Sequence, residues 1–239
     1  CFIVKRNLSG PRELLKSLKK LSSYIYHSLK VDEQKVWIAQ REGRAKDGLD
    51  RTDPAIIKML TIAKPKNIDF GEYIRNLRII PVSISYELDP CDEMKAKELS
   101  SISRNGSYKK THDEDVNSIA KGIIGDKGHI FLSFGTVLSD QYDNADEVAK
   151  VLDKSIIENY QLQGTNWLAY EMQHGKTATL DASQSIYDST EAKPTLSEIE
   201  IESFTHRVQE IPESDRFWIL EAYANPIVNR LRLISSLEP

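Results

Sequence analysis

Two short segments contain the residues whose types and spacing could perform chemistry. The first is an apolar run that ends in two cations, Lys5 and Arg6, and the second opens into Glu42, Gly43 and Arg44. Arginine can bind a phosphate through two parallel hydrogen bonds, and a carboxylate beside a glycine can approach a hydroxyl closely. Together these groups would form a binding site for a polyol phosphate, with the cations on the phosphate and the carboxylate on the hydroxyls.

Both segments are expected to follow buried strands. Residues 1–5 and Val36 to Ala39 are short and apolar, as in strands that are covered on both faces of a sheet. Ligands bind at the ends of strands in α/β sheets, so the two segments would face one cleft. Residues 79–84 and 128–134 read as further strands. Apolar spacing and helix-start signals predict helices at about 11–29, 54–63, 93–100, 113–123, 145–160, 165–173, 196–210 and 214–233.

The order of these elements predicts an α/β fold. Strand and helix alternate in the first half, which is typical of a central, mostly parallel sheet flanked by helices, here with an added helical C-terminal region. Residues 1–136 would form the α/β core, and residues 137–239 would form a helical extension packed on it. Residues 174–195, rich in Ser, Thr, Asp and Ala, are expected to form a long loop.

The composition is that of an ordinary globular protein, with 40% hydrophobic and 28% charged residues in a chain of 239. Two cysteines, Cys1 and Cys91, make no disulfide framework, and no apolar run is long enough to span a bilayer. The net charge of −4 does not indicate nucleic-acid binding. However, residues 1–46 contain eleven Lys/Arg and four Asp/Glu, a net charge of +7, which leaves −11 for residues 47–239. This basic end indicates either an anionic ligand or surface, or a solvated helix face.

The two segments, in this order, resemble the glycerol-phosphate and lysophosphatidic acid acyltransferases. That family has four sequence blocks: His-x-x-x-x-Asp, Gly-x-x-Phe-Ile-x-Arg, Phe-x-Glu-Gly-x-Arg-Ser, and a proline in an apolar strand. Phe2 to Arg6 resembles the second block, Ile38 to Arg44 the third, and Ile80 to Val82 the fourth. The run from Gly128 to Gly135 is similar to a later core strand of these enzymes. One departure is that Arg44 follows Gly43 directly, where the family has one residue between them.

The resemblance implies transfer of a fatty acyl group from an acyl-coenzyme A or acyl carrier protein thioester to a hydroxyl of glycerol 3-phosphate or lysophosphatidic acid, in phospholipid biosynthesis. It implies that Lys5, Arg6 and Arg44 hold the acceptor phosphate and that Glu42, beside Gly43, orients its hydroxyls. No cofactor beyond the acyl carrier is implied, and no nucleic-acid partner. The expected location is the cytoplasmic face of a membrane, with peripheral contact to its anionic surface or with anchoring by an N-terminal segment.

The first block, which supplies the general base and its orienting aspartate, has no counterpart in the expected place. It would precede Cys1, so the sequence is expected to start within the family domain and to be inactive alone. His27 and Asp32 have the His-x-x-x-x-Asp spacing but fall between the second and third blocks, so their order is wrong. The sequence shows no metal-ligand cluster. The other four histidines have no convincing partners, and these are His112, His129, His174 and His206.

Two alternatives remain open at this point. The same phosphate site could belong to a non-catalytic module that binds phospholipid headgroups or acts as a scaffold. A phosphate-ester hydrolase is a further reading, although the sequence shows neither a nucleophile nor a metal site for it. A His-x-x-x-x-Asp block upstream of Cys1 would favour the enzyme over the module.

Overall fold

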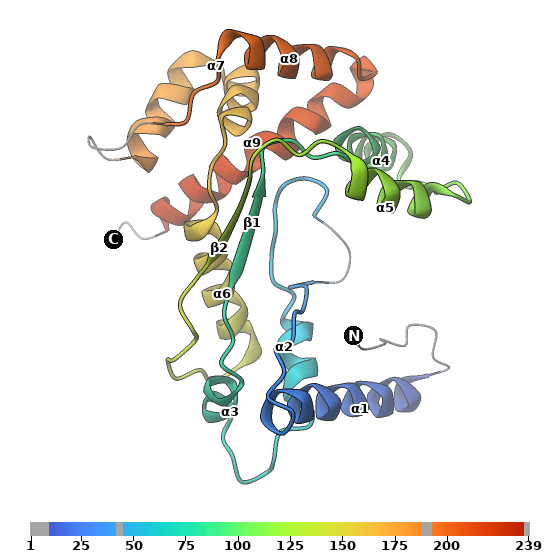
Figure 1. The fold of residues 1–239 in the computed structure, drawn as a ribbon, viewed down its shortest axis with the longest axis vertical. Helices are drawn as coiled ribbons and strands as arrows, with labels where there is room; N and C mark the ends of the chain where they lie inside the picture. Colours follow the sequence, from blue (N-terminus) through green and yellow to red (C-terminus); the bar gives the residue numbers. More distant parts are fainter. Residues whose placement is uncertain (1–9, 42–44, 188–192, 237–239) are drawn as a thin grey trace. The chain divides into compact units, whose positions relative to one another are not determined.

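The computed structural model describes residues 10–41, 45–187 and 193–236. Within these ranges the chain forms nine helices and one two-stranded antiparallel sheet (Figure 1). The expected central, mostly parallel sheet flanked by helices is therefore wrong. The helices are α1 (Pro11–Lys30), α2 (Pro54–Thr61), α3 (Phe70–Leu77), α4 (Asp92–Asn105), α5 (Glu114–Ile124), α6 (Ala145–Asn159), α7 (Gly164–Ile186), α8 (Glu198–Gln209) and α9 (Glu213–Ser235), and the strands are β1 (Val82–Tyr86) and β2 (Ile130–Phe134).

The chain divides into two compact units, each built from several segments. Unit 1 comprises residues 1–44, 51–81 and 135–155, and unit 2 comprises residues 45–50, 82–134 and 156–239. The expected division into a 1–136 acyltransferase core and a 137–239 extension remains a prediction.

Unit 1 has a core of buried side chains from α1, α2, α3 and α6. Ile25 of α1, Tyr73 and Ile74 of α3, and Val148 of α6 are almost completely buried. The predicted helix at 11–29 is confirmed, and Pro11 occupies its first turn, where its lack of an N–H costs nothing. The short helix α3 was not predicted, although Asp69 caps it by accepting a hydrogen bond of 2.7 Å from the backbone N–H of Glu72.

Unit 2 has a second core, formed mainly by α7, α8 and α9. Trp167, Phe204, Ile219 and Ile227 are buried in it. The expected loop at 174–195 is wrong as far as residue 186, because α7 continues past a non-helical residue, Gly175, whose φ is 85°. The residues after Gly175 include several weak helix formers, and the burial of Thr179 and Ala182 indicates that packing in unit 2 stabilises this part of the helix.

The β1–β2 pair is antiparallel, with Ser83 opposite Ser133 and Ile84 opposite Leu132. In β1 the usual pattern, with apolar side chains inside and polar side chains outside, is reversed. Ser83 and Ser85 are buried, whereas Ile84 is exposed on the other face. The run at 128–134 does form a strand, but the described residues show no strand at 36–39. Strand pairing depends on partners distant in sequence, so an apolar run alone cannot establish that a ladder forms.

Candidate functional site

The five residues predicted to bind the substrate, Lys5, Arg6, Glu42, Gly43 and Arg44, all lie outside the described residues. The structure therefore neither brings them together nor separates them. What it does describe is the chain on either side of the Glu-Gly-Arg segment.

In unit 1, Gln40, two residues before that segment, is joined to the chain just before α2. The backbone N–H of Asp53 donates a hydrogen bond of 2.9 Å to the carbonyl oxygen of Gln40, and the Thr52 hydroxyl donates one of 3.2 Å to the Gln40 side chain. The Thr52 N–H also donates to the Asp153 carboxylate, at 2.6 Å. We name these contacts the Gln40 neck. Loops whose two ends are fixed side by side are frequently functional.

Within unit 2, residues 45–50 are seated on α9. The Asn225 side-chain amide donates a hydrogen bond of 2.6 Å to the carbonyl oxygen of Asp47. Lys46 forms an ion pair with Glu98 of α4. Burial, and then the negative charge of Asp47, raise the pKa of Glu221. These contacts hold the residues that follow Arg44 at a defined place on unit 2.

The block resembling the family's fourth block lies next to the start of β1. Pro81 precedes Val82, the first residue of the strand, and its carbonyl oxygen accepts a hydrogen bond of 2.9 Å from the N–H of Gly135. The carbonyl oxygen of Ile79 likewise accepts one of 2.9 Å from Leu138. A proline at a strand end removes no ladder hydrogen bond, which explains why it is tolerated here.

The structure does bring His27 and Asp32 together, with His27 Nε2 at 3.5 Å from Asp32 Oδ1. Both side chains are about half exposed, and they lie at the C-terminal end of α1. A cation there is favoured by the helix dipole, so the pair has a structural explanation. An exposed pair of this kind contributes little to stability and encloses no substrate.

A second histidine–carboxylate pair lies at the end of the sheet. His129 Nδ1 is 2.6 Å from Glu87 Oε2, and the same oxygen accepts a hydrogen bond of 2.8 Å from the His129 backbone N–H. The sequence indicates no partner for His129, because Glu87 is 42 positions away and only the β1–β2 pairing makes them neighbours. A carboxylate that orients an imidazole is an element of general-base sites. Here the carboxylate also fixes the turn before β2.

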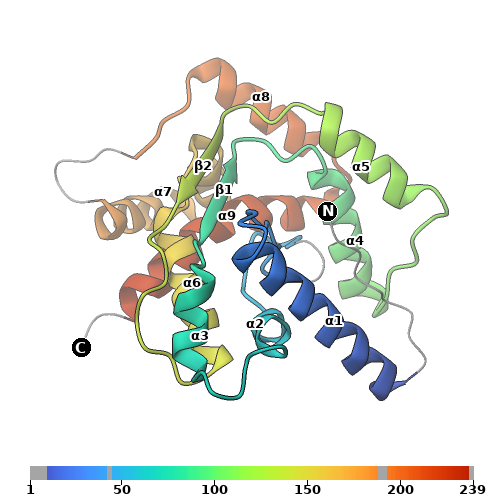
Figure 2. The same cartoon turned by 60° about the horizontal axis from the view of Figure 1, so that its bottom comes forward.

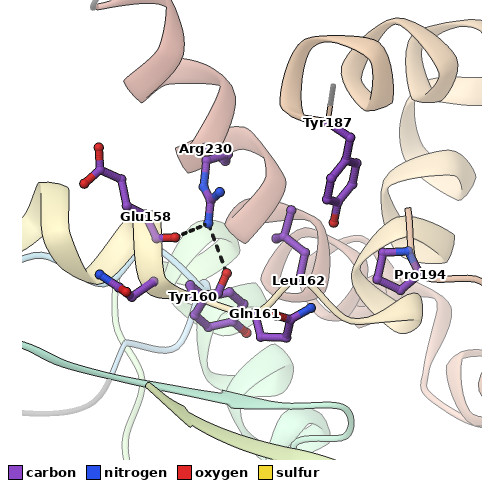
Figure 3. Close-up of a pocket in the computed structure, with 8 residues that line it drawn as sticks. Glu158, Tyr160, Gln161, Leu162, Tyr187, Pro194 and Arg230 are labelled. Atoms are coloured by element: carbon purple, nitrogen blue, oxygen red, sulfur yellow. Dashed lines mark hydrogen bonds between the residues drawn. The ribbon is translucent and has the colours of Figure 1, made fainter. Parts of the chain in front are cut away.

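The described part of unit 2 contains a polar pocket of about 400 Å³ (Figure 3). The Arg230 guanidinium borders it and donates hydrogen bonds to the carbonyl oxygens of Ile157, Glu158 and Tyr160, at 2.7 to 3.1 Å. Burial lowers the pKa of Arg230 and raises that of Tyr160. Arg230 therefore satisfies carbonyl groups at the C-terminal end of α6, which is a structural role. Figure 3 shows Tyr187 and Pro194 on the far side of the pocket.

Among the described residues, no group of three or more His, Cys, Asp or Glu could hold a metal ion. No helix in the described ranges has the length and apolar character needed to cross a membrane. Comparisons with family models, with curated proteins and with solved structures found no match to this chain.

Proposed function

We propose that this chain is part of an acyltransferase that moves a fatty acyl group from an acyl thioester to a hydroxyl of glycerol 3-phosphate or lysophosphatidic acid. The observation that supports the proposal is the order of three sequence segments, Phe2 to Arg6, Ile38 to Arg44 and Ile80 to Val82. The described residues form no parallel sheet, so the fold gives the proposal no support. The sequence blocks and the Gln40 neck remain.

In the proposed reaction the acceptor hydroxyl attacks the thioester carbonyl. A new ester bond forms, the bond from carbon to sulfur breaks, and the hydroxyl proton passes by way of a general base to the leaving thiolate. Arg6, with Lys5 and Arg44, would hold the acceptor phosphate by charge-assisted hydrogen bonds. Glu42 would orient the hydroxyl that attacks.

The Gln40 neck supports a binding role for Glu42 to Arg44 because it fixes Gln40, two positions before them, against the chain that precedes α2. Both hydrogen bonds to Gln40 come from residues just before α2, Thr52 and Asp53. Asp53 also accepts a hydrogen bond of 2.8 Å from the N–H of Ala55 and so caps α2. A loop held at its base in this way can present a carboxylate and a cation at a repeatable position.

The general base of the proposed reaction belongs to the family's first block, and the one His-x-x-x-x-Asp spacing in these 239 residues, at His27 and Asp32, follows the second block instead of preceding it. We therefore propose that the chain binds the acceptor but does not turn it over alone. The co-substrate would be acyl-coenzyme A or an acyl carrier protein, and the lipid product would be delivered to the anionic face of a membrane.

Two measurements on the 239-residue chain test this proposal. Calorimetry should show binding of glycerol 3-phosphate and no binding of glycerol, because the phosphate supplies the charge-assisted contacts. A thiol-release assay with long-chain acyl-coenzyme A and glycerol 3-phosphate should show no turnover. If binding does not depend on the phosphate group, the chain has no phosphate-binding site of the proposed kind. Turnover that is lost in His27→Gln would return the catalytic role to His27 and Asp32 and overturn the block assignment.

A further inference from the structure

Helix α1 consists of two halves with different surroundings. In its second half Leu21 and Ile25 are 9% and 1% exposed, because they pack into the core of unit 1. In its first half Leu14 and Leu15 are 44% and 59% exposed. In both Figure 1 and Figure 2 the first turns of α1 extend past α2, the helix that lies against its second half. The apolar stripe of α1 thus continues beyond the core that it packs on.

The exposed half is also strongly basic. Arg12, Lys16, Lys19 and Lys20 are all exposed, and Glu13 is the one acid among residues 11–20. At 100° per residue the four cations cluster on the side of the helix opposite the apolar stripe. Among the described residues, none of the four forms an ion pair. A net charge of +3 here contrasts with the net charge of −4 for the whole chain.

We infer that the first half of α1 docks on an anionic lipid surface, with Leu14 and Leu15 inserted at the level of the headgroups and the four cations facing lipid phosphates. The inference rests on the proposed function for its choice of a membrane as the partner. Charge complementarity supports an anionic membrane as the partner of this half of α1, since the rest of the chain is acidic and would be repelled by the same surface. Short basic helices with an exposed apolar face bind membranes in this orientation.

The test is sedimentation of the 239-residue chain with vesicles of pure phosphatidylcholine or of phosphatidylcholine with phosphatidylserine, at 25 °C. Binding is expected only to the anionic vesicles, and raising the salt concentration should weaken it. Lys16→Gln/Lys19→Gln should lower the partition coefficient about 30-fold. Leu14→Ser/Leu15→Ser should lower it about 10-fold, because two partly exposed leucines lose their burial in lipid.

Each pair of substitutions has a matched control at exposed positions elsewhere. Lys109→Gln/Lys150→Gln removes the same charge, and Ile123→Ser/Ile124→Ser removes an even more exposed pair of apolar side chains from α5. Both controls should bind anionic vesicles as the unchanged chain does. Equal binding to both kinds of vesicle, or equal losses in the control pairs, would overturn the assignment to α1. Binding of glycerol 3-phosphate, measured without lipid, reports the proposed function separately.

Discussion

The Tyr223 hydroxyl donates a hydrogen bond of 2.9 Å to the Asp92 carboxylate in the interior of unit 2. It also accepts one of 2.8 Å from the backbone N–H of Asp89. Arg207 donates to the same Asp92 oxygen at 2.7 Å and to the carbonyl oxygen of Asp89 at 3.0 Å. The start of α4 is therefore held to α8 and α9 by a buried polar network whose central member is Asp92 Oδ2, a carboxylate oxygen that accepts hydrogen bonds from both Arg207 and Tyr223.

Tyr223→Phe should lower the free energy of unfolding by about 2 kcal/mol, because Asp92 loses a donor and the Asp89 N–H loses its acceptor. Urea unfolding followed by circular dichroism measures the change. Tyr86→Phe is the control, since the Tyr86 side chain is 39% exposed. The control should change stability by less than about 0.5 kcal/mol. Equal effects of the two substitutions would mean that the network adds nothing.

The buried tyrosines also predict a loss of stability at high pH. Burial, and then the charge of Asp92, hold the pKa of Tyr223 well above its ordinary value of 10. Burial likewise raises the pKa of Tyr160. Above about pH 10 the unfolded chain releases these protons while the folded chain keeps them, so the free energy of unfolding falls as the pH rises. Each such tyrosine contributes a slope of up to about 1.4 kcal/mol per pH unit.

The measurement is urea unfolding at pH 8, 10 and 11 for the unchanged chain and for Tyr223→Phe. The variant is less stable at pH 8 but should lose less stability between pH 10 and 11, because it has one fewer buried phenol to ionise. Parallel losses in the two proteins would show that the ionisation of Tyr223 is not linked to folding.

The backbone of Gly48 lies directly against the backbone of α9. A Cβ atom added there would lie 2.1 Å from the carbonyl oxygen of Ala222, and the φ of Gly48 is 73°. Gly106 has the same φ, but an added Cβ would meet nothing within 4 Å. Gly106→Ala should therefore cost about 1 kcal/mol of backbone strain alone, and Gly48→Ala should cost at least about 2 kcal/mol more. Equal costs for the two glycines, measured by urea unfolding, would mean that residues 45–50 are not seated on α9.

The helices of this chain could be predicted from its sequence largely because their signals are local. The sequence predicts α1, α6 and α9 to within about two residues, since the apolar spacing and the first-turn signals lie inside each helix. α3 was missed, because eight residues offer too few repeats of the helical period to distinguish it from a loop.

The sheet could not be predicted in the same way. The alternation in β1 places serines, not the apolar residues, toward the interior, and Ser85 donates a hydrogen bond of 2.7 Å to the carbonyl oxygen of Gln161. Neither this acceptor nor the neighbour of His129 is visible from spacing, because both depend on segments distant in sequence. The same difficulty applies to the predicted phosphate site, since it requires two segments that are distant in sequence to lie side by side.

The outward face of the β1–β2 pair predicts self-association. Ile84, Leu132 and Phe134 are exposed on the two strands, and an apolar surface of this kind promotes aggregation or binding of apolar dyes. Leu132→Thr/Phe134→Thr keeps the strand preference and should reduce both light scattering and the fluorescence of an apolar dye. The Ile123→Ser/Ile124→Ser variant is the comparison, because those side chains are exposed on a helix. Unchanged scattering in the strand variant would show that this face is covered in solution.

The last prediction separates the roles proposed for Arg6 and Glu42. Arg6→Ala removes a charge-assisted contact with the acceptor phosphate, so the Kd for glycerol 3-phosphate should rise about 10- to 100-fold. Arg6→Lys should recover only part of this affinity, because lysine keeps the charge but cannot form two parallel hydrogen bonds. Glu42→Gln should leave the phosphate contacts intact and weaken binding less, since it changes only the group that orients the hydroxyls.

Binding of inorganic phosphate distinguishes the two residues further. Arg6→Ala should weaken it by a similar factor, whereas Glu42→Gln should leave it unchanged, because inorganic phosphate has no glycerol hydroxyl for the carboxylate to orient. If Arg6→Ala lowers the free energy of unfolding and leaves both dissociation constants unchanged, then Arg6 is structural and the phosphate must bind elsewhere. If Glu42→Gln weakens both ligands equally, the carboxylate acts by positioning the cations, and its contact with the hydroxyls is refuted.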